Sequence, residues 1–102
     1  MNLNEAVKKT KEVSDQMPKQ YGIYQRMVEL MEEIGELANA IQTEQKFKPP
    51  SRRKADLINS VCDVLFEVFS ISSIYNLDLD TEYPKVLNEI NSRREKGEFD
   101  HG

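Results

Sequence analysis

Apolar residues recur at helical spacing in four stretches of the chain, which are separated by short polar or proline-containing segments. The stretches run from residue 4 to about 17, from about 21 to 45, from about 52 to 75, and from Asp80 or Thr81 to Gly97. Apolar positions spaced by three and four residues are typical of amphipathic helices. Met17-Pro18 ends the first stretch, because the residue before a proline avoids helical backbone angles. The pattern therefore predicts an all-α domain of four helices.

The second predicted helix carries four glutamates on one side, at spacings of three and four residues: Glu29, Glu32, Glu33 and Glu36. Each like-charge pair weakens an isolated helix by about 0.2–0.5 kcal/mol, and only Arg26 is in reach to relieve the repulsion. Two interpretations stay open: a solvated acidic back of an ordinary amphipathic helix, or a site where a divalent cation neutralises the cluster. Gly35, among these glutamates, suggests close approach of a partner helix or ligand.

The third predicted helix is apolar around most of its circumference, which predicts burial on nearly all sides, Cys62 included. One narrow polar line runs through it: Asp56, Asn59, Ser60, Asp63, Glu67 and Ser70. Buried carboxylates are costly unless they are paired or bound to metal, so the line favours a functional site. If the second and third helices pack antiparallel, Asp63 could face the glutamates. Such an all-oxygen set suits Mg²⁺ or Mn²⁺.

Length and composition exclude several classes of protein. At 102 residues the chain is expected to be one domain spanning residues 1–102, with residues 1–20 as its N-terminal helix. No stretch approaches the roughly 20 apolar residues that span a bilayer, and the first residues lack a signal-peptide pattern; we expect a cytoplasmic protein without a membrane partner. One cysteine excludes an internal disulfide. A net charge of −4 argues against binding a nucleic-acid polymer.

Basic residues gather in two places. The proline-containing loop 46–54 holds five of them, Lys46, Lys48, Arg52, Arg53 and Lys54, and Ser51 is a suitable N-cap for the next helix. This loop is either simply solvated or a flexible arm that closes over phosphates. Arg93 and Arg94 either complement the C-terminal helix dipole or bind phosphate. A loose tail is expected over residues 97–102.

Several motifs, taken in order, resemble those of the all-α nucleotide pyrophosphohydrolases, the MazG-like superfamily. Glu32-Glu33-Ile34-Gly35-Glu36 is similar to the EExxE motif, and Asp63-Val64-Leu65-Phe66 to the end of the second motif, ExxD. Asn76-Leu77-Asp78-Leu79 resembles the loop that follows, and Asn91 with Arg94 the Asn-x-x-Arg of the last helix. The resemblance covers about residues 21–96. It implies a four-helix bundle completed by oligomerisation, as a homodimer or homotetramer.

The resemblance also implies an activity and roles for residues. The family cleaves nucleoside triphosphates to monophosphate and pyrophosphate with Mg²⁺, for which Mn²⁺ could substitute. Glu33, Glu36 and Asp63 would bind the metal, with Glu32 a fourth ligand or the neighbour of one. The nucleotide phosphates would contact Asn91 and Arg94. The family's lysine would fall on Leu87, so Lys85 could serve only from a displaced position.

One departure from the motifs affects the predicted site. Ser60 stands where the second motif begins with glutamate, so one anionic ligand is missing. Asp56 and Glu67 lie one turn to either side on the polar line and could compensate. The leading hypothesis is a Mg²⁺-dependent nucleoside triphosphate pyrophosphohydrolase. The alternatives are a non-catalytic bundle that binds a nucleotide or a protein, and a relative that cleaves phosphoribosyl-ATP in histidine synthesis.

Overall fold

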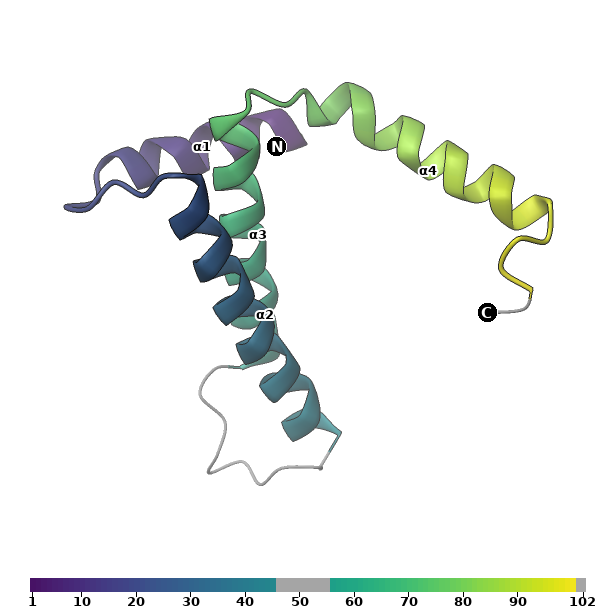
Figure 1. Cartoon of the computed structure of the whole chain (residues 1–102), viewed down its shortest axis with the longest axis horizontal. Coiled ribbons are helices and arrows are strands. Elements are labelled where there is room, and N and C mark those ends of the chain that lie inside the picture. The colour runs from purple at the N-terminus through teal and green to yellow at the C-terminus, as the bar shows by residue number, and fades with distance from the viewer. Residues whose placement is uncertain (46–55, 101–102) are drawn as a thin grey trace.

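The computed structural model describes residues 1–45 and 56–100, and within these ranges the chain forms four helices and no strand. Helix α1 spans Leu3–Asp15, α2 spans Ile23–Glu44, α3 spans Leu57–Ile74 and α4 spans Leu79–Glu95 (Figure 1). The predicted all-α class is confirmed. The whole basic loop 46–54, with the suggested Ser51 cap, lies outside the described residues.

Capping residues set the starts of α3 and α4, which differ from the predicted starts. Asp56 is extended and its carboxylate accepts the backbone N–H of Asn59 at 2.8 Å, so α3 begins at Leu57, later than predicted. Asp78, and not Asp80 or Thr81, is the N-cap of α4. Gly97, with φ of 78°, follows the end of α4 as predicted, because glycine adopts this left-handed conformation at little cost.

Asn4 and Asp80 join the N-termini of α1 and α4. The Oδ1 atom of Asp80 accepts the backbone N–H groups of Leu3 at 2.9 Å and of Asn4 at 3.3 Å. In return, Oδ1 of Asn4 accepts the N–H groups of Leu79 at 2.9 Å and of Asp80 at 3.2 Å. Each side chain therefore satisfies N–H groups that the first turn of the other helix leaves without a partner. Asp80 thus adds to the Asn2 cap of α1, while Asp78 caps α4.

Helices α2 and α3 form a hairpin, to which α1 and α4 are added. Helices α2 and α3 lie side by side, α1 packs across α3, and α4 leads away from the hairpin with its main contact to α1 (Figure 1). The radius of gyration is 16.7 Å, against about 13 Å for a compact domain of this length. The apolar side chains of Val86, Leu87 and Ile90 on α4 are consequently about half exposed. One chain alone does not close a compact four-helix bundle.

The hairpin buries polar residues and exposes apolar ones. Met31 on α2 is 61% exposed and Ile58 on α3 is 72% exposed, whereas Ser60 and Glu67 are buried. Burial of α3 on nearly all sides is therefore wrong for a single chain, and Cys62 is exposed. The pattern of apolar positions was correct, but within the described part of the chain no element covers these faces.

Gly35 does not mark a close contact within the chain. A Cβ atom added there would meet no atom of the described residues within 4 Å. The expected approach of a partner helix at this glycine is therefore not made by α3. The space beside Gly35 stays open to a ligand or to another copy.

Helix α3 comes nearer to a membrane-spanning composition than expected from the sequence. Within the described ranges it is the one helix that is long and apolar enough, by these measures alone, to cross a membrane. This is weak evidence, because core helices of soluble proteins pass the same test. Its buried carboxylate, Glu67, belongs to a polar line that would be costly in a lipid core. The cytoplasmic location stays a prediction.

Candidate metal centre between α2 and α3

The ion pair between Arg26 and Glu67 fixes the register of α2 against α3. The guanidinium Nη1 of Arg26 lies 3.3 and 3.4 Å from the two carboxylate oxygens of Glu67, and Nη2 donates to Ser14 Oγ on α1 at 2.7 Å. The rings of Tyr21 and Phe66 lie 5.1 and 5.7 Å from the same guanidinium. One buried cation thus joins three helices, and it is paired with Glu67 across the hairpin.

Three carboxylates meet further along this interface. Glu33 and Glu36 from α2 and Asp63 from α3 each place one oxygen within 4.8 Å of the others. Glu33 and Glu36 are partly buried against α3, and Asp63 is exposed. The two glutamates do not belong to a solvated back of α2, since the exposed face of that helix is the apolar one. The geometry therefore favours the second interpretation of the cluster, a cation site.

The surroundings of Glu33 are those of a carboxylate whose charge a bound cation would neutralise. Burial raises the pKa of Glu33 above its ordinary value, and the nearby charges of Glu36 and then Asp63 raise it further. The Oε2 atom of Glu33 is buried and has no hydrogen-bond partner among residues 1–45 and 56–100. Three oxygen donors and one unpartnered carboxylate oxygen fit a hard divalent cation such as Mg²⁺ or Mn²⁺. Because the donors are all oxygen, the set does not suit Zn²⁺.

The remaining suggested ligands have other partners or positions. Glu32 is exposed and does not belong to the three-carboxylate group. Asp56 caps α3 and also accepts from Nδ2 of Asn59 at 3.3 Å. Burial raises the pKa of Glu67, and its ion pair with Arg26 lowers it in part. The suggestion that Asp56 or Glu67 compensates for Ser60 therefore gains no support from the geometry.

The side chains suggested for phosphate binding lie on α4, away from the three carboxylates. Arg94 donates through Nη2 and Nε to Oδ1 of Asn91, at 2.7 and 3.1 Å. Lys85 pairs with Glu82 at 3.4 Å, and all of these side chains are exposed. Because α4 leads away from the hairpin (Figure 1), a single chain does not bring Asn91, Arg94 and Lys85 to the carboxylates.

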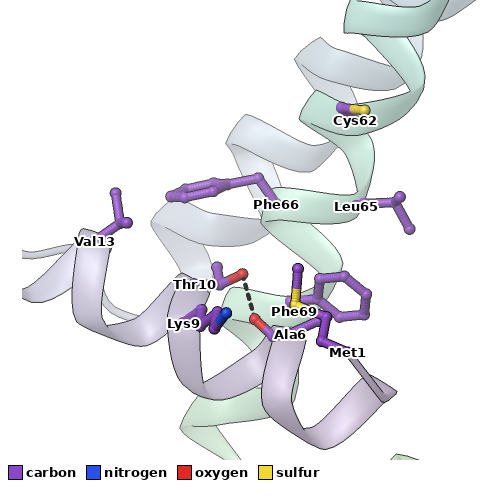
Figure 2. A pocket seen from close by; sticks show the side chains of 9 residues that line it. All are labelled: Met1, Ala6, Lys9, Thr10, Val13, Cys62, Leu65, Phe66 and Phe69. Atoms are coloured by element: carbon purple, nitrogen blue, oxygen red, sulfur yellow. Dashed lines mark hydrogen bonds between the residues drawn. The ribbon is translucent and has the colours of Figure 1, made fainter.

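A separate hollow of about 360 Å³ lies between α1 and α3 (Figure 2). By helical periodicity, the α3 residues that line it lie on a different face from the polar line. Its lining residues are Met1, Ala6, Lys9, Thr10, Val13, Cys62, Leu65, Phe66 and Phe69. The Thr10 hydroxyl donates its proton to the Ala6 carbonyl at 2.8 Å. The hollow is mostly apolar and belongs to the surface that the chain leaves uncovered.

The partner of Arg26 differs from the one expected from the sequence. Arg26 was noted as the one cation near Glu29, yet its partner is Glu67 on another helix. The separation of the two residues along the chain explains this, because helical periodicity reports neighbours one turn away and not contacts between helices. The available signal was Glu67, a carboxylate on an apolar helix with no basic residue one turn away.

The fold and the carboxylate group define the chain as an all-α domain with a candidate divalent-cation site between two antiparallel helices. The chain matches the model of the MazG nucleotide pyrophosphohydrolase domain over residues 24–97, and it belongs to that family. The resemblance noted from the motifs is thereby confirmed. The match includes α2, α3 and α4, and so the three carboxylates together with Asn91 and Arg94. No curated protein and no solved structure matches the chain.

Proposed function

We propose that the chain is a Mg²⁺-dependent pyrophosphohydrolase that cleaves a nucleoside triphosphate to the monophosphate and pyrophosphate. The observation that carries the proposal is the meeting of Glu33, Glu36 and Asp63 at one point of a MazG domain. These three side chains would hold the cation. When bound, Mg²⁺ or Mn²⁺ polarises a phosphoryl oxygen and lowers the pKa of a bound water.

The residues of the chain contribute charge and positioning, on which phosphoryl transfer chiefly depends. Glu33, Glu36 and Asp63 fix the place of the triphosphate through the cation. Arg94 supplies a planar guanidinium suited to phosphate oxygens, and Asn91 orients it through the two hydrogen bonds to Oδ1. Lys85 is less suited, because it is nearer the start of α4 and is paired with Glu82.

The site also needs a second copy of the chain. Helix α4 leads away from the hairpin of its own chain and has a half-exposed apolar stripe, while the hairpin has uncovered apolar faces. A symmetric homo-oligomer, dimer or tetramer, in which α4 of one copy packs on the hairpin of another would cover both surfaces. It would also bring Asn91 and Arg94 of one copy toward the carboxylates of the other. The extended shape of the single chain supports this arrangement.

Pyrophosphate release from a panel of nucleotides, phosphoribosyl-ATP included, tests the activity in the presence of Mg²⁺ or Mn²⁺. The Glu36→Gln and Asp63→Asn variants should each lose at least about 100-fold in kcat/KM, because the cation loses a charged ligand, while their helical circular dichroism stays unchanged. The matched control is Glu12→Gln, which neutralises an exposed glutamate on α1. Failure of the wild-type chain to turn over any nucleotide would contradict the proposal.

One observation favours a second candidate function, a non-catalytic nucleotide-binding domain. Ser60 replaces the carboxylate with which the second motif begins, so the site has fewer negative charges to hold a cation. Calorimetry distinguishes the two candidates. Nucleotide binding with no release of pyrophosphate over hours would select the binding domain.

A further inference from the structure

Ser60 differs from the other buried serines of α3. Ser70 and Ser72 donate their hydroxyls to carbonyls one turn earlier, those of Phe66 and Val68, each at 2.8 Å. Such bonds satisfy a serine within its own helix. Ser60 is 0% exposed, and its Oγ has no hydrogen-bond partner within the described ranges of the chain. A fully buried hydroxyl without a partner is unfavourable, so it calls for a specific explanation.

The register of α2 and α3 places Ser60 at the level of the carboxylate group. The Arg26–Glu67 contact sets the level of the two antiparallel helices. Two turns further along α2 is Glu33, and two turns back along α3 is Ser60, so the antiparallel register places these two residues at the same level. Asp63 lies one turn from Ser60 on the same face of α3. Ser60, with its unpartnered Oγ, thus lies at the level of the carboxylate group, where Oε2 of Glu33 is likewise buried and unpartnered among the described residues.

We propose that Ser60 belongs to the cation site, where it holds a water molecule that completes the coordination of the ion bound by Glu33, Glu36 and Asp63. This inference rests on the proposed function. Mg²⁺ and Mn²⁺ sites of this kind keep water ligands beside the carboxylates. A buried water is stable where two to four polar groups bind it, and the Ser60 hydroxyl and Glu33 Oε2 supply two. The short serine side chain therefore replaces a charged ligand with a held water.

Calorimetric titration of the metal-free, full-length chain with Mn²⁺ alone tests this role. The Ser60→Ala variant should bind Mn²⁺ roughly tenfold more weakly than the wild type, as is typical when a group that holds a metal ligand is removed. The matched control is Ser72→Ala, which removes a buried hydroxyl of the same helix outside the site. It should bind Mn²⁺ within about twofold of the wild type. The melting temperature of metal-free Ser60→Ala should not fall, because the hydroxyl has no partner to lose among the described residues.

Two results would overturn the inference: an unchanged Mn²⁺ affinity in Ser60→Ala, or no Mn²⁺ binding by the wild type. If Ser60→Ala does not fold, Ser60→Cys keeps nearly the same volume with a much weaker hydrogen-bonding group and should show the same loss of affinity. Because no nucleotide is present, the titration is independent of catalysis. Loss of affinity in Ser60→Ala, with no hydrolysis by the wild type, would support the role of Ser60 while contradicting the proposed function.

Discussion

The guanidinium of Arg26 lies 3.3 Å from the carboxylate of Glu67 in the interior of the hairpin, with only 7% and 8% of the two side chains exposed. Ser14 on α1 accepts a further hydrogen bond from the same guanidinium. The pair therefore holds α1, α2 and α3 at one point. It also sets the level at which the three carboxylates of the candidate site meet.

Replacing Arg26 with methionine should lower the free energy of unfolding by about 3 kcal/mol, because Glu67 becomes a buried charge without a partner. Urea denaturation at neutral pH measures the change. Adding Glu67→Gln to Arg26→Met should recover more than half of the loss, since the buried charge is then removed. A double variant less stable than the single one would show that the pair does not act in this way.

Glu36→Gln should change the stability of the metal-free and metal-loaded protein in opposite directions. Without metal, it relieves repulsion with Glu33 and Asp63 and should raise the free energy of unfolding by about 0.5 kcal/mol. With millimolar MgCl₂, the wild type should gain stability by binding the ion, whereas Glu36→Gln should gain little. Thermal denaturation with and without Mg²⁺ measures both effects, with Glu12→Gln as the control. If the metal-free Glu36→Gln variant were less stable than the wild type, repulsion among the three carboxylates would not be destabilising the fold.

Mixing two inactive variants should restore activity if the site is shared between copies. Glu36→Gln removes a carboxylate and Arg94→Ala removes a phosphate-binding group, so each variant alone should be inactive. After subunit exchange, half of the dimers are mixed and each mixed dimer has one intact site, which gives about a quarter of the wild-type rate. Pyrophosphate release measures recovery. An oligomer that exchanges subunits, as seen by mass spectrometry, yet recovers no activity would exclude a shared site.

Asp78 should make a pH-dependent contribution to stability. Its hydrogen bond from the Asn4 side chain, followed by those from Thr81, holds the pKa of Asp78 below the ordinary value of 3.8. A depressed pKa contributes stability above the ordinary value, and this contribution is lost as the pH falls through the pKa of the folded state. Asp78→Asn keeps an N-cap but removes the charge, so it should melt below the wild type at neutral pH.

The difference in melting temperature between Asp78→Asn and the wild type should close as the pH falls below about 3.8, the ordinary pKa of the group. Circular dichroism melts across the acid range measure it. A difference that stays constant over this range would mean that the charge of Asp78 contributes nothing and that only the cap matters.

Local pattern was sufficient to predict the helices and the acidic cluster. Periodicity located each helix, although α1 ends at Asp15, two residues before the predicted end at Met17-Pro18. Helix starts were less predictable, because several residues near a start can serve as caps. Asp78 and Asp80 are both suitable caps for α4, and Asp80 is engaged by α1 instead. That choice depends on a contact between the two ends of the sequence.

The Arg26–Glu67 contact between helices could not be predicted from the pattern of apolar and polar residues. Periodicity identifies the faces of α2 and α3 but not which face meets the other helix. The chain buries Ser60 and Glu67 and exposes Met31 and Ile58. An apolar face in the sequence does not reveal whether the same chain or another copy covers it. The role of Arg26 and the position of the unpartnered Ser60 hydroxyl become clear only once the register between α2 and α3 is known.

The reciprocal hydrogen bonds of Asn4 and Asp80 bring two positively polarised helix ends together, where the carboxylates of Asp78 and Asp80 offset them. The direction of α4 is thus determined by the first turn of α1. A peptide tag joined directly to Met1, or trimming of the first four residues by a protease, would disturb this joint. Arg94, in the last turn of α4, would then lose its orientation relative to the hairpin, although the change lies at the other end of the polypeptide.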